Sequence, residues 1–223
     1  MLPRYERNIP SLTLEESQLL RKKTVAVIGC GGLGGYIIEQ LARLGIGAIR
    51  IIDGDVFEES NLNRQLFSDV TVLGKPKTEV SRARIAAVNP DVQVQSLYGY
   101  LDEMNAEPFL DGCDAVVGAL DNIFTRRILE KTCEKLGIPY IYGAIHGWVA
   151  QVAVDMPGQR LIEKMYPEGA SFKDKSSLSF TPGLCASMQT ALCVKLLVGR
   201  EVQTGTIFYF DLLEQEFETI PMV

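Results

Sequence analysis

The stretch TVAVIGCGGLGG at residues 24–35 decides the fold of this chain. Its first half, residues 24–28, is a short apolar run, which is typical of a buried parallel strand. Its second half has glycines at positions 29, 31 and 34, the G-x-G-x-x-G spacing in which missing side chains let the backbone turn tightly and approach a phosphate. A helix is expected to follow as far as Leu44, because Gly45 is a typical helix stop. The stretch therefore predicts a strand, a phosphate-binding turn and a helix.

Outward from this stretch, strands and helices alternate up to about residue 145. Expected strands are 48–52, 92–97, 115–117 and 139–142, and expected helices are 14–21, 76–88 and 123–136. Repeated strand–helix units favour an α/β fold with a doubly wound, Rossmann-like, mostly parallel sheet.

The pattern changes after Gly147. We expect a strand at 148–155, a helix at 184–197, and a C-terminal antiparallel extension of two strands near 205–211 and 214–220. The polar stretch 164–182 is interpreted as a mobile functional loop.

The composition argues against several classes of function. The 22 lysines and arginines against 28 acidic residues give a net charge of −6 without a basic run, so nucleic-acid binding is not expected. No apolar stretch is long enough to cross a membrane, and the N-terminus lacks the apolar core of a signal peptide, so we expect a cytoplasmic protein. The five cysteines include no C-x-x-C pair and His146 is the single histidine, which disfavours a disulfide framework, a zinc cluster or a histidine triad.

Charged residues follow the predicted strands. Asp53 closes the second strand, where a carboxylate typically binds ribose hydroxyls. An NAD-dependent oxidoreductase would share this feature, but Arg64 and Lys77 follow soon after, and such cations stabilise a triphosphate under attack. Asp121 follows the strand at 115–117 and either holds Mg²⁺ or caps the helix beginning near Ile123; the spacing leaves both open.

With these residues assembled, the chain resembles the ThiF/MoeB/HesA family of ubiquitin-activating-enzyme-like adenylyltransferases. The motifs that carry the resemblance are Arg4-Tyr5-x-Arg7, the Gly29 loop, Asp53-x-Asp55, Ser60-Asn61-Leu62-x-Arg64-Gln65, Lys75-Pro76-Lys77 and Leu120-Asp121-Asn122. The resemblance implies an enzyme that uses ATP and Mg²⁺ to adenylate the C-terminal Gly-Gly carboxylate of a small ubiquitin-like (β-grasp) sulfur-carrier protein. Pyrophosphate would be released, and the pathway would be thiamin or molybdopterin biosynthesis.

The resemblance also implies roles for individual residues. The implied nucleotide-binding set is Gly29, Gly31 and Gly32 along the phosphates, Asp53 on the ribose, Ser60, Asn61, Arg64, Gln65 and Lys77 around the triphosphate, and Asp121 with Asn122. The implied catalytic set is Arg7, Arg64, Lys77 and Asp121, with Asp121 as the metal ligand. Arg7 would reach the γ-phosphate of the neighbouring subunit, which implies a homodimer. The chain would be one domain, 1–223, with a nucleotide-binding core at 1–145 and a partner-binding and dimer extension at 146–223.

The chain departs from the family in its cysteines. Many members carry two C-x-x-C pairs that bind structural zinc, whereas residues 164–182 contain no cysteine, so no structural zinc is expected. Cys185 is the nearest candidate for a reactive thiol, because the N-terminus of a helix can lower a thiol pKa. Burial as a small apolar residue is the commoner role for Cys185 and Cys193. Trp148 and Tyr142 either line a channel for the partner's tail or pack in the core.

Other functions stay open. One is a catalytically silent scaffold that binds a ubiquitin-like protein, although such partners typically lose the phosphate-site cations that this chain retains. Another is an NAD-dependent oxidoreductase, which would need an acid or base beside the hydride that we do not find. The same chemistry on a tRNA base or a peptide amide is a third; the acidic composition disfavours tRNA.

Overall fold

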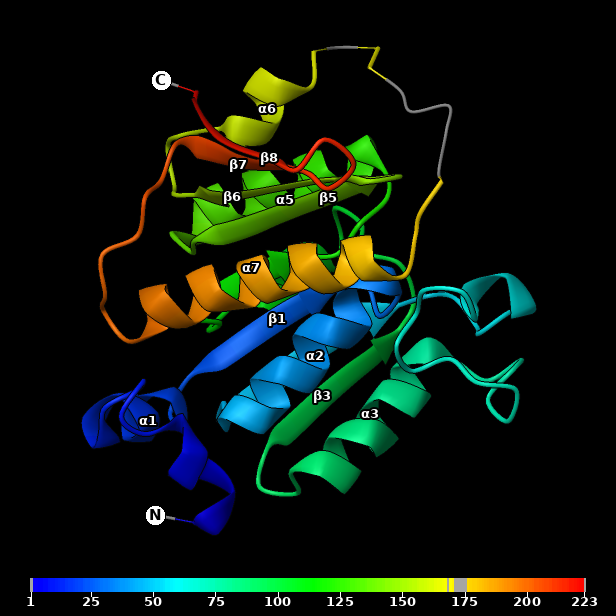
Figure 1. Cartoon of the computed structure of the whole chain (residues 1–223), viewed down its shortest axis with the longest axis vertical. Coiled ribbons are helices and arrows are strands. Elements are labelled where there is room, and N and C mark those ends of the chain that lie inside the picture. The colour runs from blue at the N-terminus through cyan, green and yellow to red at the C-terminus, as the bar shows by residue number, and fades with distance from the viewer. Residues whose placement is uncertain (1, 168, 171–175, 223) are drawn as a thin grey trace.

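The structure is a computed structural model that describes residues 2–167, 169–170 and 176–222. Its centre is an eight-stranded sheet in the order β3-β2-β1-β4-β5-β6-β7-β8 (Figure 1). The strands are β1 (Thr24–Ile28), β2 (Ala48–Asp53), β3 (Gln93–Tyr98), β4 (Ala115–Gly118), β5 (Tyr140–His146), β6 (Val149–Asp155), β7 (Thr206–Asp211) and β8 (Glu216–Pro221). The first five pair in parallel and the last three antiparallel, which confirms the predicted fold class.

Helices cover both faces of the sheet. One face carries α1 (Leu14–Leu20), α2 (Gly32–Leu44), α3 (Lys77–Val88) and α7 (Phe180–Leu197), and the other carries α4 (Ala106–Leu110), α5 (Ile123–Leu136) and α6 (Leu161–Met165). Strand β1 is buried on both sides, because Val25 and Val27 pack in the first layer whereas Ala26 and Ile28 pack in the second. A strand covered on both faces reads as an unbroken apolar run, as this one does.

The N-terminal segment forms a short 3-10 helix, η1 (Pro3–Asn8), which packs at the C-terminal end of α2. Tyr5 is buried there, and a Cβ on Gly45 would lie 2.6 Å from its ring. The sequence did not predict η1, since its helical residues carry no apolar periodicity.

The stretch 164–182, interpreted as a loop, is partly helical, so this prediction needs correction. Helix α6 extends to Met165, and α7 begins at Phe180 rather than at Leu184. Pro182 lies in the first turn of α7, where a proline lacks no needed hydrogen bond. Residues 168 and 171–175 lie outside the described residues.

Helix α6 has its N-terminal N–H groups capped by two buried carboxylates that belong to other elements. Glu130 of α5 accepts hydrogen bonds from the backbone N–H groups of Ile162 (2.6 Å) and Glu163 (3.2 Å), and Asp155 accepts one from Leu161 (3.3 Å). These caps come from other elements, so the local sequence carried no helix-start signal.

One buried amide joins two central strands. Gln189 of α7 is fully buried and donates hydrogen bonds to the carbonyl oxygens of Gly118 in β4 (2.8 Å) and Ile141 in β5 (3.3 Å). A Cβ on Gly143 would lie only 2.3 Å from this amide, so β5 needs a glycine at that position.

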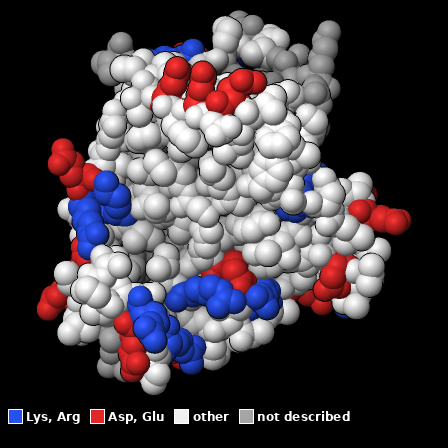
Figure 2. All heavy atoms as spheres, in the orientation of Figure 1, with Lys and Arg blue, Asp and Glu red and all other residues white. Residues whose placement is uncertain are grey.

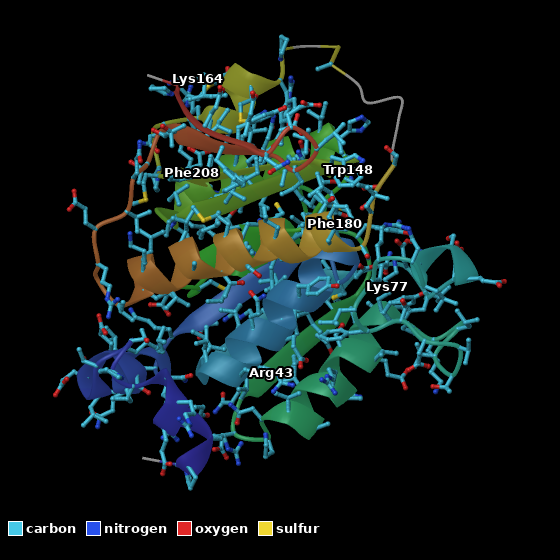
Figure 3. All side chains as sticks on the ribbon, viewed as in Figure 1. Arg43, Lys77, Trp148, Lys164, Phe180 and Phe208 are labelled. Carbon is cyan, nitrogen blue, oxygen red and sulfur yellow. The ribbon has the colours of Figure 1, made fainter. Side chains whose placement is uncertain are left out.

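Two arginines on the α2–α3 surface, Arg43 and Arg84, pair with one acidic residue. Figure 2 shows positive and negative side chains side by side in this region, and Figure 3 labels Arg43 within it. The largely buried Glu39 lies 2.7 Å from both Arg43 and Arg84. The pair with Arg84 joins α2 to α3, whereas the pair with Arg43 lies within α2. No helix in the described ranges is long and apolar enough to cross a membrane.

Candidate active site

A cleft of about 750 Å³ opens at the carboxyl ends of the parallel strands. The segments after β1, β2, β3 and β4 line one half, and residues from β5, β6, β7 and the end of α6 line the other. Ligands of doubly wound sheets bind at this edge, where the strand order reverses between β1 and β4.

The glycine turn after β1 forms the floor of the cleft. Gly29 has φ +100°, and a Cβ there would lie 2.5 Å from the carbonyl oxygen of Ala119, so only glycine fits. Gly31 and Gly32 line the cleft with ordinary space around them. Gly31 precedes α2 without any side-chain cap, so the first N–H groups of α2 are available to an anion.

Asp53 is held rigidly beside this turn. Its two carboxylate oxygens accept hydrogen bonds from the backbone N–H groups of Cys30 (2.7 Å) and Asp55 (2.8 Å). Burial raises the pKa of the Asp53 carboxyl despite these bonds. A fixed carboxylate at the end of β2 can accept hydrogen bonds from ribose hydroxyls.

A short antiparallel contact delivers Lys77 to the cleft. Val56 pairs with Pro76, and the backbone N–H of Lys77 donates to the carbonyl oxygen of Asp55 (3.0 Å). The Lys77 side chain, only 7% exposed, forms an ion pair with Asp55 at 3.0 Å. Figure 3 shows Lys77 at the start of α3 and Lys164 in the other half of the molecule; both line the cleft.

The segment between β2 and α3 supplies three further polar residues to the cleft: Asn61, Arg64 and Gln65. Arg64 packs beside the glycine turn, since its Cγ would lie 3.9 Å from a Cβ on Gly32. Its guanidinium donates to the carbonyl oxygen of Ser60 (2.9 Å), which therefore supports the site from outside the lining. Within the described residues, the buried Oε1 of Gln65 lacks a hydrogen-bond partner.

The structure tests one of the two interpretations of Asp121, that it caps the helix α5. The cap of α5 is Asn122, whose Oδ1 accepts a hydrogen bond from the N–H of Thr125 at 2.8 Å. Asp121 and Asn122 both line the cleft next to the end of β4. The capping interpretation of Asp121 is therefore wrong, and its role as a metal ligand stays a prediction.

Arg126 was not predicted as a site residue, yet it ties the two halves of the cleft together. Arg126 is 4% exposed and donates to the hydroxyls of Tyr142 (3.2 Å) and Tyr166 (2.9 Å). It also donates to the carbonyl oxygen of Leu120, the residue before Asp121. A charged residue on the apolar side of the helix predicted at 123–136 could have signalled this role.

Of the predicted site residues, two are absent from the cleft lining: Ser60 and Arg7. Arg7 belongs to η1, at the C-terminal end of α2, whereas the glycine turn lies at its N-terminal end. A helix of 13 residues is about 20 Å long, so Arg7 cannot reach the cleft of its own chain.

The cysteines are not suited to nucleophilic chemistry. All five are buried. Cys185 lies in the second turn of α7, its thiol directed at the carbonyl oxygens of Ala144 (3.7 Å) and Gln151 (3.6 Å), and burial raises its pKa to about 12. The idea of a low-pKa thiol is therefore wrong, and the packing interpretation holds. Tyr142 is also buried, whereas Trp148 packs against Phe180 outside the cleft lining, with ring centroids 4.9 Å apart.

The fold and the cleft define a nucleotide-binding protein of the doubly wound α/β class. The chain belongs to the ThiF family, whose model matches residues 5–223. It is 34% identical over 229 residues to the SAMP-activating enzyme E1 of Haloferax volcanii, covering 99% of this chain and 85% of that protein. It is 32% identical over 234 residues to the sulfur carrier protein adenylyltransferase of Thermus thermophilus, covering 98% and 86%.

Solved structures share the fold. The crystal structure of E. coli MccB with ATP superposes with a TM-score of 0.86 at 23% identity, covering 100% of this chain and 71% of that one. The prediction of an adenylyltransferase of the ThiF family is confirmed by the family match and the named relatives.

Proposed function

We propose that this chain uses ATP to adenylate the C-terminal Gly-Gly carboxylate of a small ubiquitin-like, β-grasp sulfur-carrier protein. The observation that carries the proposal is one continuous cleft, in which Arg64 and Lys77 meet the Gly31 turn and which extends into the C-terminal half of the sheet. A nucleotide suits the first part, and an extended peptide tail suits the second. The name of the Thermus relative supports the same class of acceptor.

The chemistry needs no general base. A C-terminal carboxylate has a pKa near 3.5 and is ionised at neutral pH. Its oxygen bonds to the α-phosphorus while the bond to the bridging oxygen breaks, which leaves an acyl-adenylate and pyrophosphate. Arg64, Lys77 and the N–H groups at the start of α2 stabilise the charge on the phosphates. Alignment of the two substrates in one cleft supplies the remaining acceleration.

Magnesium fits the acid at the end of β4. Asp121 lines the cleft without serving as the cap of α5, and Mg²⁺ in nucleotide sites typically takes one or two carboxylates and keeps several waters. When bound, the ion would offset the negative charge of the phosphates.

A second copy of the chain would complete the site. Arg7 lies too far from its own glycine turn to contact the nucleotide, and the family resemblance assigns it to the neighbouring subunit. We therefore propose that the protein is a homodimer. We also propose that it works in the cytoplasm. Inactive Arg7→Ala and Lys77→Ala proteins, once mixed and re-equilibrated, should recover about a quarter of wild-type activity, because half the dimers then carry one intact site. Two variants that stay inactive together would refute the shared site.

ATP–pyrophosphate exchange with candidate carrier proteins tests the function. Exchange should require a free Gly-Gly tail and Mg²⁺, and Arg64→Ala, Lys77→Ala or Asp121→Ala should each lower it by roughly 10²-fold or more. Lys75→Ala is the matched control, since this exposed lysine lies outside the cleft lining. ATP binding without exchange for any carrier would favour a silent scaffold, and nicotinamide binding without ATP affinity would favour an oxidoreductase.

A further inference from the structure

Three side chains from separate segments form a hydrogen-bonded chain in the cleft. The hydroxyl of Tyr100 donates to Oδ1 of Asp55 at 2.6 Å, and the ammonium of Lys77 donates to Oδ2 of the same carboxylate at 3.0 Å. All three residues line the cleft. Asp55 therefore joins a tyrosine that follows β3 to the lysine that begins α3.

Tyr100 is not held by the core. It is 70% exposed, and its ring lies flat against the backbone of Gly54, where a Cβ would come within 2.7 Å of the ring. Its position therefore depends on the carboxylate of Asp55 and on this glycine, which directly follows Asp53. A tyrosine held in this way contributes little to folding and is available for a role in the cleft.

The Asp55–Lys77 ion pair works against the proposed role of Lys77. A lysine whose ammonium lies 3.0 Å from a carboxylate must loosen that contact before it can neutralise a phosphate. The hydrogen bond from Tyr100 withdraws negative charge from Asp55, and it stays with the carboxylate when the lysine turns to the nucleotide. The hydrogen bond thus lowers the cost of releasing Lys77.

We propose that Tyr100 is a positioning residue that holds Asp55 so that Lys77 can be released to the phosphates of the nucleotide. This inference rests on the proposed adenylation, in which Lys77 turns from Asp55 to the phosphates as charge develops in the transition state. It assigns Tyr100 no contact with the reacting atoms.

The test is Tyr100→Phe in ATP–pyrophosphate exchange. The variant keeps the ring on Gly54 and removes the hydroxyl, so the KM for ATP should change by less than about twofold while kcat falls about tenfold, the usual scale of a hydrogen bond to a charged group. Tyr98→Phe is the matched control, because this exposed tyrosine ends β3 outside the cleft lining and should leave both constants unchanged.

A double-mutant cycle separates positioning from a general loss of structure. In an Asp55→Asn background, where Lys77 has no carboxylate to leave, Tyr100→Phe should lower kcat no further. A wild-type kcat for Tyr100→Phe, or the same tenfold loss in the Asp55→Asn background, would overturn the inference. Failure of the wild-type protein to catalyse exchange would instead refute the adenylation itself, together with the role that depends on it.

Discussion

Gly34 and Gly35 are neighbours in the first turn of α2, yet alanine should have opposite effects at the two positions. A Cβ on Gly34 would lie 1.9 Å from the carbonyl oxygen of Gly29, a backbone atom in a turn already tight against Ala119. A Cβ on Gly35 would lie 3.5 Å from the side chain of Leu66, an ordinary contact. The clash is confined to one residue of the pair.

The magnitudes follow from two opposing effects. Alanine is favoured over glycine inside a helix by about 0.8–1 kcal/mol, and both positions gain this. Overpacking typically costs about 1–3 kcal/mol, and a backbone neighbour makes the upper end of that range appropriate at Gly34. We therefore expect Gly34→Ala to lower the free energy of unfolding by about 2 kcal/mol and Gly35→Ala to raise it by up to about 1 kcal/mol.

Urea unfolding of the two variants and the wild-type protein measures this difference directly, as a shift in the midpoint at constant slope. The displaced Gly29 turn should also weaken ATP binding in Gly34→Ala. If Gly34→Ala proved as stable as Gly35→Ala, the glycine turn would not be locked against α2, and the reasoning would be refuted.

Three further predictions concern stability and reactivity. Asn122→Ala removes the cap of α5 and should cost about 1 kcal/mol in thermal unfolding; an unchanged Tm would contradict the assigned cap. Burial and Asp155 raise the pKa of Glu130 to about 8, so between pH 4.5 and 8 the folded protein holds a proton that the unfolded chain has released. The free energy of unfolding should therefore fall as pH rises through this window, and it should fall less in Glu130→Gln. If the urea midpoints of the two proteins depend on pH in the same way, this role of Glu130 is wrong. Cys185, with its pKa raised to about 12, should resist iodoacetamide at pH 8 when folded and react after unfolding; rapid labelling of the native protein would disprove its burial.

The features that could be predicted from the sequence are those with local signals. The unbroken apolar run of β1, the glycine spacing after it and Asp53 at the end of β2 all lie within one strand–helix–strand unit, so they identified the nucleotide end of the cleft. Arg64 and Lys77 were placed there because the family motifs keep their spacing, and the structure brings both to the same edge of the sheet.

The features that were missed depend on contacts between distant segments. Helix α6 is capped by Glu130 and Asp155 from other elements, so its own sequence shows no start signal. Tyr100 follows a strand as many surface tyrosines do, and its link to Asp55 exists only because β3 lies beside β2. The position of Arg126 in its helix could have marked it as unusual, but its partners Tyr142 and Tyr166 come from β5 and from the residue after α6.

The buried amide of Gln189 has an evolutionary consequence. A side chain at position 143 would strike Gln189, and a smaller residue at 189 would remove the hydrogen bonds to the carbonyl oxygens of Gly118 and Ile141. A substitution at only one of these two positions should lower fitness. Both residues must therefore change together, or a less fit single variant must come first. In sequences related to this one, substitutions at 143 and 189 should therefore occur together, because a side chain at 143 and the amide of Gln189 would occupy the same space.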